Sequence, residues 1–165
     1  MKIFAFFFSL LLLFAPAIAG ALTMEEIRQH IKEGNPFRAY QELKPLAEKG
    51  NAEAQYELAG FYHYGYVSSA DFKTARFWYE RAAKQGNPDA MIGLAAMERA
   101  GLGASPDEKR AFVWVTIADN YIIKTNDREI LEKIRDNIVK GLKPEEIEIA
   151  LAEARSFTPK IEGQQ

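Results

Sequence analysis

A repeated stretch, GNAEAQYELAGFYHYGYVSSADFKTARFWYERAAKQ at residues 50–85 followed by GNPDAMIGLAAMERAGLGASPDEKRAFVWVTIADNY at residues 86–121, dominates this sequence. The period is 36 residues, and twelve positions are identical between the two copies, where ordinary composition would give about two or three. The identical pairs are Gly50/Gly86, Asn51/Asn87, Ala54/Ala90, Leu58/Leu94, Ala59/Ala95, Gly65/Gly101, Ser69/Ser105, Asp71/Asp107, Lys73/Lys109, Ala75/Ala111, Trp78/Trp114 and Ala82/Ala118. A tandem period of this length is typical of a solenoid of stacked helix pairs or similar units.

Each copy has the residue pattern of two helices. Asn51 and Asn87 are N-cap residues for the first helices, and Asp71 and Asp107 for the second helices. Glycine-containing turns at 65–70 and 101–106 separate the helices within a copy. The positions spaced to face inward are Ala54, Leu58, Phe61, Tyr62, Ala75, Trp78, Tyr79, Ala82, Ala90, Leu94, Met97, Ala111, Trp114 and Ala118. We therefore expect repeats at residues 51–86 and 87–121.

A degenerate first helix pair is expected at residues 20–50. Thr23 and Glu26 form a capping-box pattern for its first helix, and Asn35-Pro36 is a cap-and-start pattern for its second. Pro45 predicts a kink in that second helix. The apolar positions expected to be buried are Ile27, Ile31, Phe37, Tyr40, Leu43, Leu46 and Ala47.

The period fails after Asn120, because Ile122 stands where a helix-ending glycine is due. Asp127 and Pro144 predict the starts of two further helices. Their expected buried positions are Ile130, Ile134, Ile138, Val139, Ile147, Leu151, Ala154 and Phe157. Because solenoids need atypical ends, we expect a helical C-terminal cap at residues 122–158 and a flexible polar tail at residues 159–165.

The first 19 residues have the pattern of a secretory signal peptide. Lys2 is followed by an apolar run over residues 3–14, then by Pro16 and the small-residue pattern Ala17-Ile18-Ala19. We expect cleavage after Ala19, with Ala21 as a second position; an uncleaved membrane anchor is the alternative. The expected location is therefore periplasmic or secreted, without a lipid anchor and without a stable membrane span after cleavage.

Composition narrows the classes of partner and chemistry. The chain has 165 residues, a net charge of −2 and no cysteine. Charges of both signs are mixed along it, so no basic stripe for nucleic acid is present and no nucleic-acid partner is expected. The absence of cysteine excludes disulfides, thiolate metal sites and cysteine nucleophiles.

Both copies resemble the Sel1-like repeat, a relative of the tetratricopeptide repeat. The first copy carries this pattern at Ala52, Ala54, Leu58, Tyr62, Gly65, Asp71, Ala75, Trp78, Ala82, Ala83 and Gly86. The second carries it at Ala90, Leu94, Gly101, Gly103, Asp107, Ala111, Trp114 and Ala118. The chain departs from this pattern at four positions: Ala59 and Ala95 each replace a glycine, Val67 replaces a turn glycine, and Glu98 replaces a tyrosine. The resemblance implies an all-α fold, a short right-handed solenoid of antiparallel helix pairs, and binding to other proteins.

No constellation of residues indicates catalysis, a cofactor or a metal. His30 and His63 lie in different expected helices without clustered acidic or histidine partners. Asp71 and Asp107 are explained as helix caps, and the turn at 101–103 lacks the preceding strand that a phosphate loop needs. Trp78 and Trp114 are interpreted as core residues. The chain is therefore not expected to be an enzyme.

The expected binding surface is the concave face, which the first helices of such pairs line. The candidate protein-binding residues are Tyr56, His63, Tyr64, Met91, Ile92 and Arg99; aromatic residues, Met and Arg are enriched at interfaces. Tyr56 and Ile92 align with each other, so packing between repeats is an alternative role for them. Glu98 is expected to make the second repeat's part of this groove more polar.

Three functions are consistent with these patterns. The first is an exported, non-catalytic interaction module or adaptor that binds protein partners of the cell envelope. The second is an envelope enzyme acting on peptidoglycan or β-lactam-like substrates, although no pair of ionisable residues supports it. The third is a small subunit whose short array is completed by stacking on a partner, because two full repeats are close to the minimum for a continuous core.

Overall fold

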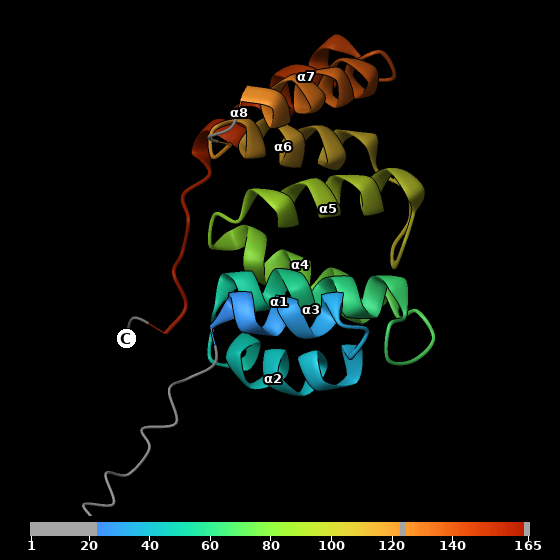
Figure 1. Cartoon of the computed structure of the whole chain (residues 1–165). Helices are drawn as coiled ribbons and strands as arrows, with labels where there is room; N and C mark the ends of the chain where they lie inside the picture. The colour runs from blue at the N-terminus through green and yellow to red at the C-terminus, as the bar shows by residue number, and fades with distance from the viewer. Residues whose placement is uncertain (1–22, 123–124, 164–165) are drawn as a thin grey trace, which may run out of the picture.

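The computed structural model describes residues 23–122 and 125–163, which form eight helices and no strand. The helices are α1 (Met24–Lys32), α2 (Pro36–Glu48), α3 (Ala52–Tyr64), α4 (Phe72–Lys84), α5 (Pro88–Ala100), α6 (Glu108–Asp119), α7 (Thr125–Val139) and α8 (Pro144–Ser156). Each helix from α1 to α6 packs on the next one along the chain, and both α7 and α8 pack on α6. Figure 1 shows the resulting stack, from α2 at one end to α7 at the other. The prediction of an all-helical solenoid is confirmed.

The four predicted caps of the repeats are formed. The side chains of Asn51, Asp71, Asn87 and Asp107 each accept a hydrogen bond from the backbone N–H three residues on, at 2.8–3.1 Å. These bonds satisfy amides that have no partner inside their helices. Equivalent residues in the two copies therefore begin α3 and α5, and α4 and α6, in the same way.

The turns inside the repeats depend on glycine. Gly65 and Gly101 end α3 and α5 in the left-handed conformation, with φ of 67° and 66°. A Cβ on Gly65 would lie 2.6 Å from the carbonyl oxygen of Ser68. Glycine is required at this turn because it has neither the steric penalty nor the clash.

The core alternates small and large side chains. Ala54, Ala75 and Ala82 are fully buried beside Leu58, and the same positions in the next copy repeat this arrangement. Alanine allows helices to approach closely while the large side chains fill the remaining space. The predicted inward-facing positions of α3 and α4 are buried, apart from Tyr62, which is half-buried.

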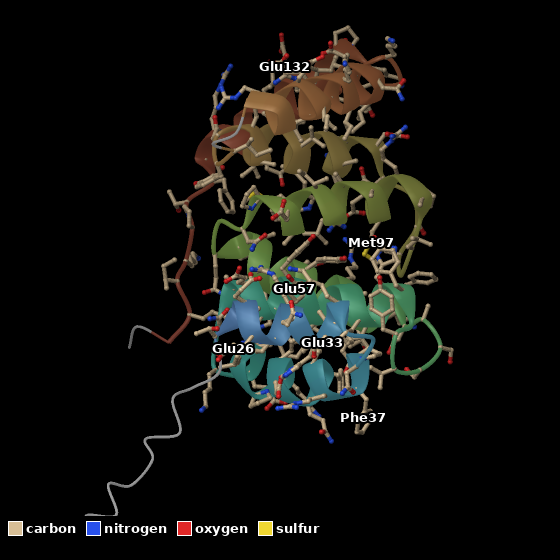
Figure 2. The ribbon with its side chains drawn as sticks, viewed as in Figure 1. Glu26, Glu33, Phe37, Glu57, Met97 and Glu132 are labelled. Atoms are coloured by element: carbon tan, nitrogen blue, oxygen red, sulfur yellow. The ribbon has the colours of Figure 1, made fainter. Side chains whose placement is uncertain are left out.

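Several details of the first helix pair differ from expectation. The capping box of Thr23 and Glu26 is present, but the side chain of Asn35 makes no capping hydrogen bond. Pro45 lies in the last turn of α2, and the helix continues to Glu48. Phe37 was predicted to be buried but is 58% exposed; it points away from the stack at the α2 end (Figure 2). The buried stripe of α2 is instead formed by Ala39, Leu43 and Ala47, a spacing of four residues that excludes position 37.

The C-terminal cap differs from expectation at the start of α7 and at one buried position. Asp127 was predicted to begin a helix, but α7 begins at Thr125, so Asp127 lies within it. Ile130 is exposed, whereas Leu131 and Ile138 are buried. Ile134, Ile138 and Val139 pack on the core as predicted, and Leu131 takes the inward position that was assigned to Ile130.

The tail was predicted to be flexible over residues 159–165, and within it residues 159–163 make specific contacts with the stack. The backbone N–H of Lys160 donates to the carbonyl of Lys84 at 2.8 Å, and Glu162 is bound by Arg81, Gln55 and Gln85. The segment runs from α8 back along one edge of the stack (Figure 1). Polar side chains read as a solvated tail here make specific contacts.

Two of the sequence-based expectations concern export and membrane insertion. The predicted signal peptide, with its cleavage positions, lies outside the described residues. Within residues 23–122 and 125–163, no helix combines the length and the apolar character needed to cross a membrane.

Candidate functional site: an aromatic groove

Two adjoining hollows lie on the face formed by the first helices. One, of about 180 Å³, is lined by residues of α1, α3 and α4, and the other, of about 250 Å³, by residues of α3, α4 and α5. They share Tyr56, Tyr64 and Tyr79. We call the two together the aromatic groove; its remaining lining residues are Ile31, Glu57, Gly60, Phe61, His63, Tyr66, Asp89, Ile92, Gly93 and Ala96.

Tyr79 forms the floor of the groove. It projects from α4 between α3 and α5, and it is 4% exposed. A Cβ on Gly93 would lie 3.2 Å from its ring, and one on Gly60 would lie 3.9 Å from its hydroxyl. Burial raises the pKa of this hydroxyl. The glycine of α5 thus makes room for an aromatic floor that stays uncharged.

His63 is enclosed by aromatic rings. Its ring centroid lies 4.7 Å from that of Tyr64, 5.6 Å from Phe72 and 6.1 Å from Tyr79. Its Nδ1 is buried without a hydrogen-bond partner among the described residues. Burial lowers the pKa of the imidazole, so the neutral form is present at neutral pH and the wall of the groove carries no positive charge there.

The groove carries two carboxylates. Glu57, labelled in Figure 2, accepts a hydrogen bond from Arg28 at 2.9 Å, whereas Asp89 is exposed at the start of α5. Tyr56 lies between them and is half-buried. Burial, followed by the negative charges of Asp89 and Glu57, raises the pKa of the Tyr56 hydroxyl. The site is therefore aromatic with a negative rim.

The structure brings together four of the six candidate binding residues. Tyr56, His63, Tyr64 and Ile92 all line the hollow between α3 and α5. Met91 was predicted to be at this surface, and that is wrong: it is fully buried in the core. Arg99 lines neither hollow and pairs with Glu108 at 3.3 Å.

The sequence-based list omitted Tyr66, Tyr79 and Asp89. Tyr79 was assigned to the core, which is correct for its burial but not for its part in the floor. The signal that could have found it is Gly93, because an isolated glycine inside a helix indicates close packing by a neighbour.

The prediction for Glu98 is wrong. This residue was expected to add polarity to the groove, but its side chain is fully buried, accepts a hydrogen bond from Arg76 and forms an ion pair with Arg110 at 3.0 Å. Arg76 also pairs with Glu80 at 3.1 Å. The hydrogen bond to Glu98 raises the pKa of Arg76. Glu98 is thus part of a buried ion network that joins α4, α5 and α6.

The tryptophans and histidines occupy different settings. Trp78 is in the core as predicted, whereas Trp114 is half-buried and lines a separate hollow of about 230 Å³ against Phe157. His30 lies 2.8 Å from the Glu42 carboxylate.

Across residues 23–122 and 125–163, no three His, Asp or Glu side chains are grouped closely enough to hold a metal ion.

Comparisons with known proteins agree with this architecture. The family model of the Sel1 repeat matches residues 52–87 and 88–118. A solved structure of a protective antigen present in uropathogenic Escherichia coli strains, described as displaying an SLR fold, superposes with a TM-score of 0.72 at 23% sequence identity. The superposition covers 81% of this chain and 28% of that protein, so this chain spans less than a third of its length. No curated protein matches the sequence significantly. The protein is therefore an all-α solenoid that carries two consecutive Sel1 repeats.

Proposed function

We propose that this protein is an exported, non-catalytic interaction module that binds a protein partner in the aromatic groove. The observation that carries the proposal is the pair of adjoining hollows with shared tyrosines on the face of α1, α3 and α5. Sel1 repeats suggest protein partners, and exposed aromatic clusters are the surface feature that interfaces favour.

The chemistry of the groove favours an extended segment with apolar and basic side chains. Tyr64 and Tyr66 are more than half exposed, at 65% and 53%, and their rings lie 5.6 Å apart. Tyrosine faces attract both apolar groups and cations. Asp89 adds a negative charge at the rim. A lysine or arginine of the partner would therefore lie near Asp89, beside the tyrosine rings.

The cell envelope is the proposed location. Support comes from residues 1–21, with a positive residue, an apolar run and a small-residue cleavage pattern. N-terminal sequencing of the protein recovered from its host tests this part. We expect the mature chain to begin at Gly20, and recovery of an intact N-terminus in the membrane fraction would contradict export by cleavage.

Photocrosslinking tests the groove directly. A photoreactive phenylalanine analogue is placed at Tyr64 in the full chain, and a matched control carries it at Phe37, which is similarly exposed at 58% but outside the groove. After irradiation in host cells, we expect a discrete adduct from position 64 only, identified by mass spectrometry. Equal adducts from both positions, or none from position 64, would contradict binding in the groove.

A substitution measures the role of charge once that partner is identified. Asp89→Lys reverses the charge at the rim, and Asp89 is exposed, so the fold is retained. We expect at least tenfold weaker binding, since a repelling charge replaces an attracting one. Unchanged affinity would show that the partner does not place basic groups at this rim.

A further inference from the structure

The C-terminal tail, residues 158–163, lies along the turns that join successive helix pairs. Pro159 packs near Gly86, where an added Cβ would lie 3.3 Å from the proline ring. Glu162 packs on Gly50, where an added Cβ would lie 2.8 Å from the Cβ of Glu162. Both glycines have positive φ, 94° and 95°. The tail thus packs against the backbone at two equivalent turns, and Figure 1 shows it running along that edge of the stack.

Glu162 occupies a polar notch formed by Gln55, Arg81 and Gln85. The Nε2 of Gln55 donates to the Glu162 carboxylate at 2.9 Å, and the Nε of Arg81 donates to it at 3.1 Å, with a second bond from the Arg81 Nη2. The backbone N–H of Glu162 donates to the Oε1 of Gln85 at 2.9 Å. The notch therefore contacts both the side chain and the main chain of one glutamate.

The side chains of the notch are also held by contacts that do not involve the tail. Gln55 is fully buried and Gln85 is 8% exposed. The Nε2 of Gln85 donates to the Oε1 of Gln55 at 2.8 Å, and Gln55 also donates to the carbonyl of Ala47 at 3.0 Å. The Arg81 guanidinium lies over the Trp78 ring, 4.9 Å from its centroid. Each recognising side chain is thus held in place by a contact within the repeat.

The second repeat has no equivalent of this notch. One period later, Gln55, Arg81 and Gln85 are replaced by Met91, Ile117 and Tyr121. Met91 and Ile117 are buried apolar residues, so stacking of the repeats does not itself require polar groups at these positions. Buried glutamines are costly unless their hydrogen bonds are satisfied. The polar residues of the first copy thus match the carboxylate and the N–H of the segment that they contact.

We propose that this notch is a binding site for a glutamate on an extended protein segment, which the chain's own tail fills in cis. An extended acidic segment of a partner protein binds there by displacing the tail. The hydrogen bonds from Arg81 lower the pKa of Glu162, so the occupant is charged at neutral pH. The notch uses side chains outside the aromatic groove, and this proposal therefore stands or falls independently of the proposed function.

A peptide titration of the full chain tests the site. The probe is a synthetic peptide with the sequence of residues 157–163, and its matched control carries glutamine in place of Glu162. The receiving chain is Glu162→Ala, whose own tail lacks the carboxylate. The control Glu148→Ala changes an exposed glutamate of α8 and keeps the tail intact. Binding is followed by NMR through the side-chain amide resonances of Gln55 and Gln85.

We expect the glutamate peptide to shift the side-chain amide resonances of both Gln55 and Gln85 in Glu162→Ala. Its binding to the wild type and to Glu148→Ala should be at least tenfold weaker, because their own tail competes at high effective concentration. The glutamine peptide, and the double variant Arg81→Gln/Glu162→Ala, should each lose at least tenfold in affinity. Three outcomes would each overturn the proposal. The two peptides could bind equally, or the glutamate peptide could bind wild type and Glu162→Ala equally. The third is the absence of any shift up to about 5 mM peptide, the millimolar range of such competition. A well-dispersed spectrum of each variant establishes that it is folded.

Discussion

Glu98 shows how one residue changes the role of a repeat position. In the first copy the equivalent residue is Tyr62, whose hydroxyl lies 2.9 Å from that of Tyr40. In the second copy the position holds a carboxylate that is bound by two arginines and sealed from solvent. The low dielectric inside a protein makes the loss of one member of such a network costly. An exposed pair that also joins α5 to α6, Arg99 with Glu108, provides a comparison.

We expect Glu98→Gln to lower the free energy of unfolding by about 3 kcal/mol, because it leaves the buried Arg76 without its main counter-charge. The control Glu108→Gln should change it by less than about 1 kcal/mol, as is usual for exposed pairs. Urea denaturation at pH 7 measures both. Similar effects of the two substitutions would show that the network contributes no more than a surface pair.

Helix α4 and its C-cap residue contribute to the buried ion network, to the aromatic groove and to the notch. Arg76 joins the buried network, Tyr79 forms the groove floor, and Arg81 with Gln85 forms the notch. These side chains point in different directions because successive residues of a helix are rotated by about 100°. A change in how α4 packs would therefore alter the groove and the notch together.

We expect the docking of the tail on the stack to depend on pH through the carboxylate of Glu162. Its pKa in the docked state is lowered below 4.5 by the hydrogen bonds from Arg81. A group of this kind stabilises the docked state above its free pKa, and that stabilisation is lost as the pH falls through the docked pKa. We expect the protection factor for amide exchange of Lys160 to fall as the pH drops below about 4.5, the free value. In Glu162→Gln it should be low and independent of pH; protection that persists in this variant would contradict the role of the carboxylate.

Periodicity predicted the elements better than it predicted their surfaces. The caps at 51, 71, 87 and 107 were predictable because a cap depends only on local sequence. Met91 was misplaced because the 36-residue alignment gives equivalence between positions but not which of them faces solvent. The notch was beyond prediction: Gln55 and Glu162 are 107 residues apart, and no local pattern joins them.

At the scale of the whole molecule, nearly all packing is between helices that are neighbours in sequence. Such an array folds by local propagation, with little long-range organisation required. Two features of the described residues depart from this pattern: α8 packs on α6, and the tail connects the C-terminal cap to the turns at Gly86 and Gly50. The tail's hydrogen bonds to Arg81 and Gln55 join residues that are 81 and 107 positions apart in the chain, so they require the closure of a long loop.

We therefore expect Glu162→Ala to accelerate unfolding while leaving the folding rate nearly unchanged, because the lost contacts form after the transition state. An increase of about tenfold in the unfolding rate corresponds to about 1.4 kcal/mol. Stopped-flow kinetics over a range of urea concentrations measures both rates. A slower folding rate would show that the tail docks early.

The return of the tail also brings the two ends of the described chain together. Helices α1 and α2 are successive antiparallel neighbours, which puts Thr23 at the same end of the pair as Lys49, and an added Cβ on Gly163 would lie 3.3 Å from the Lys49 carbonyl. Nearby termini are the condition under which a circularly permuted chain retains its fold. A chain in which a short linker joins Gly163 to Thr23, with new ends opened at the exposed turn between Ser68 and Ser69, should therefore retain the fold as a circular permutant.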